Sequence, residues 1–359
     1  MEQAGGWLGF DRFMALALYE PGLGYYANGS TKFGTLPQGT LEADGNLKGA
    51  GSDFVTAPEM TPLFGYALAQ QVAQALQATG TTDIWEFGAG TGALALQLLT
   101  ALKAMGQPVQ RYTIVDLSEC LKERQRHTLR EHLDTVQWVS ELPPSFSGVV
   151  VGNEVLDAMP VTLLSRVQGQ WFERGVSQKD GQWVWEDRPT ALRPPLEIEG
   201  PHDYLTEIHP QAHAFVHTLA DWLQRGAAFF LDYGFPEAEY YHPQRHMGTV
   251  MCHRAHRADS NPLDAVGLKD ITAHVDFTGI AVAAQDAGLE VLGYTSQAHF
   301  LMNCGLIDLM QNAPLPERAA AQKLVMEHEM GELFKVIGLV KGPVFEAVGF
   351  ARGDRTHRL

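Results

Sequence analysis

Apolar residues recur at helical spacing in the first part of the chain. The period is clear over residues 10–18 and again over 62–79, where Gly80 supplies a helix stop. Between these two predicted helices, residues 34–51 are rich in glycine and lack an apolar period, so we expect a loop there. Residues 1–80 are therefore predicted to form a helical N-terminal segment that closes over a neighbouring site as a lid.

From residue 81 onward, short apolar runs alternate with amphipathic stretches. Strands are predicted over 83–87, 110–116, 136–139 and 149–152, with helices over 93–105 and 119–133 between them. Such strand–helix repeats predict a parallel sheet with right-handed crossovers. The fold class predicted from this pattern is α/β, a Rossmann-like doubly wound sheet.

The regular alternation stops after Pro160. Short antiparallel strands are predicted over 163–168, 171–176 and 182–185, then a helix over 211–223, a strand over 227–233, a helix over 278–287 and a last strand over 345–351. We accordingly assign the core to residues 81–160, 211–235 and 276–359. The insertions 161–210 and 236–275 are predicted to form a substrate or partner subdomain.

Composition and charge restrict the classes of partner. The chain has 359 residues, of which 45% are hydrophobic and 19% charged, as is usual for a globular enzyme. A formal net charge of -16 argues against unspecific binding of nucleic acid. It would suit a basic protein partner, although solubility alone also explains an acidic surface.

The cysteines and the N-terminus bear on location. Cys120, Cys252 and Cys304 are far apart and odd in number, which argues against a disulfide framework or a zinc site. The first residues lack the features of a signal peptide, and no run is long and apolar enough to span a membrane. We expect a cytoplasmic protein that does not insert into membranes.

A glycine-rich turn between a predicted strand and helix carries the strongest chemical signal. Its pattern is Glu86-x-Gly88-x-Gly90-x-Gly92. Glycines let the backbone turn sharply and let a ligand approach, and the helix amides that follow can bind a carboxylate or a phosphate. A tight turn without any ligand is the simpler alternative.

The residue pattern of this turn also fits a second class of cofactor, the dinucleotides. Gly88-x-Gly90-x-x-Ala93 matches the dinucleotide fingerprint. Glu86 and the alternation through Gly92 favour S-adenosylmethionine instead. Asp116, which ends the next strand, would bind ribose hydroxyls of either cofactor. The predicted cofactor contacts are Glu86, Gly88, Ala89, Gly90, Asp116, Leu117 and Asn153.

An acidic segment follows the fourth predicted strand. Asn153 and Glu154 come first, and Asp157 lies three residues further on. Two carboxylates in this position can grip a cationic acceptor or remove its proton, so we predict catalytic roles for Glu154 and Asp157. The alternative is a helix N-terminus enriched in acidic residues.

Several separated motifs together carry a resemblance to a known family. They are Phe13-Met14, Ala17-Leu18-Tyr19-x-Pro21-x-x-Gly24-Tyr25-Tyr26, Asp53-Phe54-Val55-Thr56-Ala57-Pro58-Glu59, Leu63-Phe64-Gly65, Glu86-Phe87-Gly88-Ala89-Gly90-Thr91-Gly92, Asn153-Glu154-x-x-Asp157-Ala158-Met159-Pro160-Val161, Asp232-Tyr233-Gly234, Asp270-Ile271-Thr272-Ala273-His274-Val275-Asp276-Phe277 and Met330-Gly331-x-x-Phe334-Lys335. In this order the chain resembles the MidA family, which includes the mitochondrial complex I assembly methyltransferase.

The resemblance implies an S-adenosylmethionine-dependent protein methyltransferase. For the mitochondrial relatives it implies symmetric dimethylation of an arginine on a respiratory complex subunit. Gly88, Gly90 and Asp116 would hold the cofactor, and Glu154 and Asp157 would face the acceptor. The chain departs from the family's frequent G-P-G-R-G turn, and it has Asp116 where the family often has glutamate.

Two further segments and two rival functions complete the predictions. Histidines at 242, 246, 253 and 256 lie beside Cys252 at spacings that match no zinc motif, so no metal is predicted. Because the family has a similar segment, the resemblance implies a loop near the acceptor. Residues 53–59 either fold over the cofactor or form a packed corner in which Asp53 or Thr56 caps the next helix. The rivals are a NAD-dependent oxidoreductase, for which no Tyr-x-x-x-Lys pair is present, and a non-catalytic assembly factor.

Overall fold

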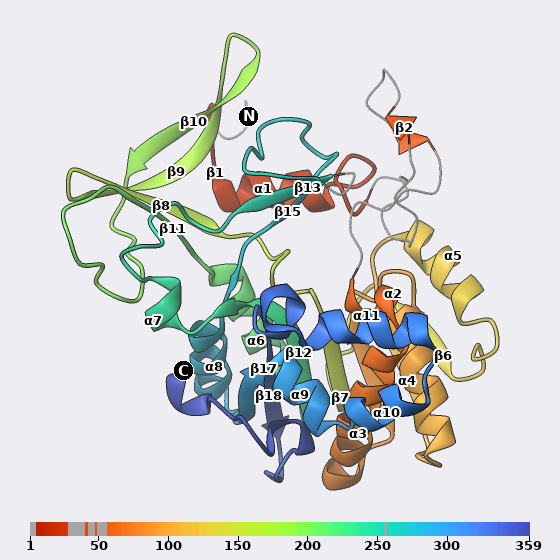
Figure 1. Ribbon diagram of the computed structural model, residues 1–359. Coiled ribbons are helices and arrows are strands. Elements are labelled where there is room, and N and C mark those ends of the chain that lie inside the picture. Colours follow the sequence, from red (N-terminus) through yellow and green to blue (C-terminus); the bar gives the residue numbers. More distant parts are fainter. Residues whose placement is uncertain (1–4, 28–39, 42–46, 49–55, 255–256) are drawn as a thin grey trace. The chain divides into compact units, whose positions relative to one another are not determined.

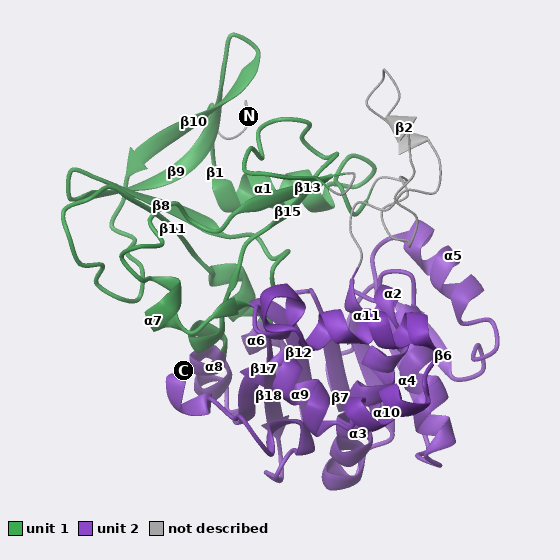
Figure 2. Cartoon of the chain, viewed as in Figure 1, with its two compact units in different colours: residues 1–30, 156–215, 234–280 green, residues 31–155, 216–233, 281–359 purple. Residues whose placement is uncertain are grey.

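The computed structural model describes residues 5–27, 40–41, 47–48, 56–254 and 257–359. The chain divides into two compact units (Figure 2). Unit 1 comprises residues 1–30, 156–215 and 234–280, and unit 2 comprises residues 31–155, 216–233 and 281–359. The chain thus leaves and re-enters each unit more than once.

Unit 2 is built on a twisted sheet with the strand order β17-β18-β12-β7-β4-β5-β6 (Figure 1). The strands are β4 (Asp83–Phe87), β5 (Arg111–Val115), β6 (Val136–Val139), β7 (Phe146–Asn153), β12 (Leu223–Phe235), β17 (Glu290–Ser296) and β18 (Phe334–Lys341). Strands β6, β5, β4, β7 and β12 pair in parallel, whereas β18 runs antiparallel to both of its neighbours. The predicted α/β class and the mostly parallel sheet are confirmed.

The order of the strands locates a point where the chain reverses its direction across the sheet. After β4 the chain moves outward to β5 and β6, and then returns to β7 on the other side of β4. In open α/β sheets, ligands bind at the carboxyl ends of the strands beside such a switch point. The topology therefore predicts that a ligand would bind to the residues that follow β4, β5 and β7.

Helices pack around this sheet and close the core of unit 2. They include α2 (Ala57–Met60), α3 (Leu63–Thr79), α4 (Ala93–Ala104), α5 (Glu119–Thr128), α9 (Gln297–Asn303), α10 (Leu306–Asn312) and α11 (Leu315–Val325). Helix α3 packs against α4 and also contacts α9, α10 and α11. Strand residues such as Ile84, Val149 and Phe229 are fully buried in the resulting cluster. Their near-continuous apolar runs suit strands covered on both faces.

Unit 1 contains two antiparallel sheets. The larger sheet has β1 (Trp7–Gly9), β8 (Thr162–Val167), β9 (Gln170–Lys179), β10 (Gln182–Pro189) and β11 (Tyr204–Ile208), and the smaller one has β13 (Met251–Arg254), β14 (Arg257–Asp259) and β15 (Asp270–Thr272). Helix α1 (Phe10–Tyr19) contacts β8, β9 and β15. Residues from both insertions and from the N-terminal segment thus fold together. The division into a lid, a core and a substrate subdomain stays a prediction.

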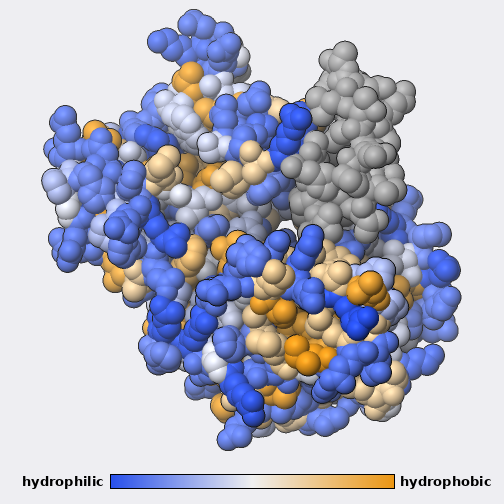
Figure 3. Space-filling view, viewed as in Figure 1, coloured by the Kyte–Doolittle hydropathy of each residue, from blue (hydrophilic) through white to orange (hydrophobic). Residues whose placement is uncertain are grey.

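Two further helices connect the two units along the chain. Helices α6 (Pro210–Trp222) and α8 (Phe277–Asp286) each begin in unit 1 and end in unit 2. Within unit 1, α7 (Glu237–Tyr240) follows β12, and β16 (Val275–Asp276) pairs in parallel with the end of β12. Hydrophilic residues dominate the face of the molecule drawn in Figure 3, with apolar groups scattered among them. No helix in the described ranges could cross a membrane.

Three predicted elements differ from the structure. The helix predicted over 119–133 ends at Thr128, because the chain continues in turns, in which the His132 amide donates to the Leu129 carbonyl oxygen and the Thr135 amide to that of His132. The predicted strand over 345–351 is wrong: Val348–Phe350 is a short 3-10 helix, and the last strand is β18. Apolar residues there are buried by a tertiary contact, since the ring of Phe350 packs against Phe300 of α9. Of the predicted loop 34–51, the described part consists of β2 (Thr40–Leu41) and β3 (Leu47–Lys48), and the rest lies outside the described residues.

Candidate functional site

The glycine turn lies at the carboxyl end of β4, as its position in the sequence predicts. Gly88, Gly90 and Gly92 have φ angles of 65°, 52° and 85°, a left-handed conformation that other residues adopt only with strain. A Cβ atom at Gly88 would lie 2.8 Å from Cγ2 of Val155. The bare backbone of Gly88 is therefore required both by its conformation and by its neighbour.

Asp116 follows β5 and is tied to this turn by a residue that sequence reasoning missed. The buried Gln125 of α5 donates from Nε2 to the Gly90 carbonyl oxygen at 3.0 Å and to Asp116 Oδ2 at 2.8 Å. Its Oε1 accepts a hydrogen bond from Trp138 Nε1 at 2.8 Å. The only sequence signal for this role is a glutamine on the inward side of an otherwise charged helix.

The carboxylate of Asp116 keeps the capacity to bind a ligand. Its Oδ1 accepts from the Ser118 amide at 2.8 Å, and Oδ2 accepts from Gln125. Each carboxylate oxygen has two lone pairs, so acceptor positions remain for two ribose hydroxyls. Burial raises the pKa of Asp116, against hydrogen bonds that lower it. The next residue, Leu117, is 75% exposed and offers an apolar surface beside this carboxylate.

Glu86 lies one residue before the end of β4 and is buried inside unit 2. Its Oε2 accepts a hydrogen bond from the Tyr112 hydroxyl of β5 at 2.7 Å. Burial raises the pKa of Glu86 to about 8, although the Tyr112 hydrogen bond lowers it and the charge of Asp116 adds to the rise. The Glu86 side chain is consequently protonated at neutral pH.

This raised pKa predicts a pH-dependent stability. Between the ordinary glutamate pKa of about 4.5 and the folded pKa of about 8, the folded state binds more protons than the unfolded state. The free energy of unfolding should then fall as pH rises, by up to about 1.4 kcal/mol per pH unit from this group. Urea unfolding at pH 5 and pH 8 measures the effect. Glu86→Gln should flatten the difference, and an unchanged pH dependence in that variant would contradict the assignment.

The end of β7 places a second polar group at the same edge of the sheet. Asn153 donates from Nδ2 to Glu154 Oε1 at 2.9 Å, and its Oδ1 is buried without a hydrogen-bond partner among the residues that the structure describes. Glu154 has a φ of 54°, an uncommon value for a residue with a side chain. No helix begins here, because a turn leads from residue 154 to β8. The alternative of an acidic helix N-terminus is therefore wrong.

Asp157 belongs to unit 1, where it lies near two tyrosines from the N-terminal segment. Its carbonyl oxygen accepts from the Ala273 amide at 2.9 Å. Tyr26 donates from its hydroxyl to Asp270 Oδ1 at 2.9 Å, and its ring stacks on Tyr19 with centroids 5.6 Å apart. Burial holds the pKa of both tyrosines above the usual value, and the charges of Asp270 and Asp157 raise it further.

The segment 53–59 is only partly described. Asp53 lies outside the described residues, and Thr56 precedes α2 without making a side-chain capping bond, so capping by Thr56 is wrong. Instead, Pro58 and Glu59 are bound to α4 and to the turn before it: the Pro58 carbonyl accepts from Gln97 Nε2 at 2.7 Å, and Glu59 Oε1 accepts from the Thr91 hydroxyl. Glu59 and Thr91 also line a cavity of about 420 Å³ in unit 2.

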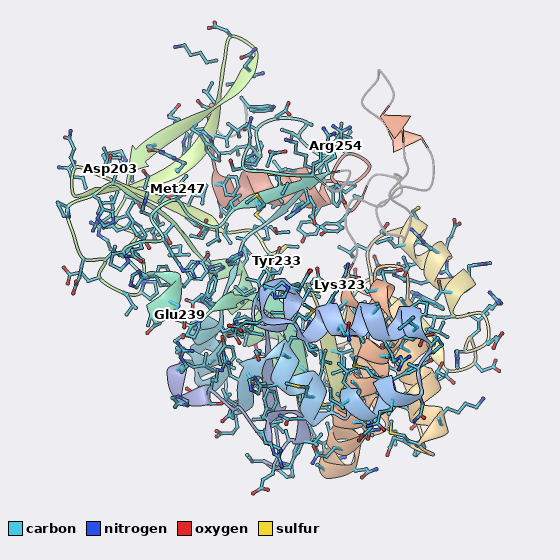
Figure 4. All side chains as sticks on the ribbon, in the orientation of Figure 1. Asp203, Tyr233, Glu239, Met247, Arg254 and Lys323 are labelled. Atoms are coloured by element: carbon cyan, nitrogen blue, oxygen red, sulfur yellow. The ribbon has the colours of Figure 1, made fainter. Side chains whose placement is uncertain are left out.

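The histidine segment is spread over separate elements of unit 1. His242 Nδ1 accepts from the Gln244 amide at 3.2 Å, and the ring of His246 lies 6.0 Å from that of His202. His253 is on β13, beside the Arg254 labelled in Figure 4, and His256 lies outside the described residues. No group of three or more His, Cys, Asp or Glu side chains suited to a metal ion occurs in the described part of the chain.

The model of the family of S-adenosyl-L-methionine-dependent methyltransferases matches residues 67–295, which include the glycine turn, Asp116 and the end of β7. The chain belongs to this family. Protein arginine methyltransferase NDUFAF7 of Danio rerio is 27% identical over 86% of this chain and 75% of its own length. The homologous mitochondrial protein of Caenorhabditis elegans is 26% identical over 82% of this chain and 72% of its own.

A protein from Burkholderia thailandensis, whose crystal structure contains S-adenosyl-homocysteine, is 50% identical in sequence to this methyltransferase. The match covers all of this chain and 94% of that chain, with a TM-score of 0.92. These findings decide between the cofactors that the glycine turn allowed, because the methyltransferase uses S-adenosylmethionine and not NAD. They also identify the protein as an enzyme, which removes the non-catalytic rival.

The predicted cytoplasmic location is wrong by the same comparison. The curated relatives are mitochondrial proteins. The prediction rested in part on unpaired cysteines, which indicate a reducing compartment without saying which one. Cys252 and Cys304 are buried as free thiols, and their pattern carries no further information on location.

Proposed function

We propose that this methyltransferase transfers methyl groups to an arginine side chain of a protein substrate. One observation carries the proposal. The turn after β7 holds the Glu154 carboxylate at the edge of the sheet that also carries the glycine turn, with Val155 packed against Gly88. The named activity of the relatives, protein arginine methyltransferase, is the reaction that a carboxylate at this position suits.

The predicted cofactor residues fit S-adenosylmethionine by four properties. The backbone of Gly88 leaves a surface without a Cβ, Asp116 has free lone pairs for ribose hydroxyls, and Leu117 offers an exposed apolar face to an adenine ring. Asn153 Oδ1 is a buried acceptor that a cofactor ammonium group could satisfy. We assign cofactor contacts to Glu86, Gly88, Ala89, Gly90, Asp116, Leu117 and Asn153.

The chemistry requires a group that orients arginine and takes up a proton. When bound, S-adenosylmethionine supplies an electrophilic methyl group. The arginine guanidinium is protonated at working pH, since its pKa exceeds about 12, and it loses one proton when its nitrogen gains the methyl group. Glu154 would accept this proton and align the planar guanidinium by charge-assisted hydrogen bonds. Asp157, three residues later, would supply a second carboxylate.

The substrate is proposed to be a protein, and the resemblance points to a respiratory complex subunit. The formal net charge of -16 favours encounter with a basic, arginine-containing segment. The insertions 161–210 and 236–275 fold together in unit 1, which supports their assignment to substrate or partner recognition.

The proposal predicts the chemical identity of the product. The enzyme, incubated with hypomethylated cell protein and S-adenosylmethionine labelled on the methyl group, should yield ω-N-methylated arginine after acid hydrolysis. The control is the same extract with the Glu154→Gln variant. Label recovered only in methyllysine or methylhistidine would contradict an arginine acceptor.

A further inference from the structure

A buried carboxylate lies beside the acidic turn, on the next strand of the sheet. Asp232 is only 1% exposed and is located near the carboxyl end of β12, just before the Tyr233 labelled in Figure 4. Leu231 is the last residue of β12 in register with β7, where it pairs with Asn153. Asp232 therefore stands one residue beyond that ladder, level with the turn that follows β7.

The carboxylate of Asp232 binds this turn directly. Its Oδ2 accepts the Val155 amide at 3.1 Å, and its Oδ1 accepts the Tyr233 amide at 2.9 Å. The preceding amide of the turn, that of Glu154, donates to the Leu231 carbonyl oxygen at 2.9 Å. Two successive amides of the turn are thus fixed to β12.

The conformation held in this way is strained. A residue with a side chain at the φ of 54° found for Glu154 costs roughly 1–2 kcal/mol relative to its preferred conformations. Such strain persists only where surrounding contacts determine the backbone, and it concentrates at functional sites. The hydrogen bond from the Val155 amide to Asp232 is one of those contacts.

Val155 connects the turn to the cofactor side of the sheet. Its Cγ2 lies 2.8 Å from the position of a Cβ on Gly88 and 3.3 Å from one on Gly152. A shift of the Val155 backbone would therefore move the adjoining Glu154.

We propose that Asp232 is a positioning residue for methyl transfer, which acts by fixing the turn that carries Glu154. This inference rests on the catalytic role proposed for Glu154. Asp232 is 1% exposed, and each of its carboxylate oxygens accepts a hydrogen bond from a main-chain amide. Small misplacements of a reacting group can cost about 10²-fold in rate, so the effect should appear in the maximal rate and not in cofactor binding.

The test compares Asp232→Ala, Asp232→Asn and a matched control. Asp354→Ala removes an aspartate of unit 2 whose Oδ1 likewise accepts two main-chain amides, those of Tyr294 and Thr356. Asp232→Ala should lower the maximal rate about 10- to 100-fold, with the KM for S-adenosylmethionine changed less than about threefold. Asp232→Asn should recover most of the rate, because its amide oxygen can still accept the Val155 amide. The control should lose thermal stability only.

Equal losses in rate and cofactor affinity, or no recovery with Asp232→Asn, would overturn the proposal. A double variant that combines Asp232→Ala with Glu154→Gln distinguishes failure of the positioning role of Asp232 from failure of the catalytic role proposed for Glu154. If Asp232 acts through Glu154, Asp232→Ala should add little to the loss in Glu154→Gln, whereas multiplied losses contradict the positioning role. If Glu154→Gln alone keeps full activity, the proposed function of Glu154 fails instead.

Discussion

Replacing Glu154 with glutamine is expected to lower the maximal rate of methyl transfer by about 10²–10⁴-fold, the range usual for loss of a general base. Glutamine keeps the size and the oxygen that accepts from Asn153, but it cannot take up the proton that the arginine nitrogen releases. S-adenosylhomocysteine should still bind, because the residues assigned to the cofactor are unchanged. Methyl incorporation measures the first quantity and calorimetry the second.

Glu290→Gln is the matched control for this variant. Glu290 is an exposed glutamate at the first residue of β17, at the opposite edge of the same sheet. We expect its rate to equal that of the unaltered enzyme. Full turnover in Glu154→Gln, with cofactor binding intact, would remove Glu154 from the catalytic role.

Gly88→Ala is expected to weaken binding of S-adenosylhomocysteine by about 5- to 150-fold. The new Cβ would lie 2.8 Å from Val155 Cγ2, and overpacking of this kind costs about 1–3 kcal/mol. To avoid Val155, the main chain at residue 88 would have to move from the position in which it is proposed to contact the cofactor. Calorimetric titration with S-adenosylhomocysteine measures the change.

Gly80→Ala is the matched control, which distinguishes the strain of a left-handed alanine from the steric conflict between a Cβ at residue 88 and Val155. Gly80 has a φ of 61°, close to the 65° of Gly88, but a Cβ there meets no atom within 4 Å. Both variants should lose about 1 kcal/mol of stability from the left-handed backbone, whereas only Gly88→Ala should lose cofactor affinity. Equal affinities in the two variants would show that Gly88 does not form part of the cofactor site.

The sequence by itself predicted the features that depend on neighbours along the chain. The alternation of apolar strands and amphipathic helices predicted the sheet, since period and turn residues are local properties. The glycine turn from Gly88 to Gly92 and the position of Asp116 at a strand end follow from the same local pattern, and the structure has them at one edge of unit 2. The family comparison then confirmed the S-adenosylmethionine cofactor.

Local pattern failed where burial comes from distant residues. The apolar residues over 345–351 resemble a strand, yet Phe350 is buried by Phe300 of α9 and forms no sheet pairing. The segment Phe334–Lys341, a near-continuous apolar run, forms the last strand instead. Periodicity indicates that a residue is buried but does not indicate which partner buries it.

Only the tertiary structure decided which side chains hold the site in place. Gln125 binds Gly90 across 35 residues as well as Asp116, Asp232 binds Val155 across 77, and Tyr26 binds Asp270 across 244. Each contact depends on the strand order and register, which bring together segments that have no fixed separation along the chain. The sequence therefore determined which groups could do the chemistry, and the packing of the sheet determined how those groups are held.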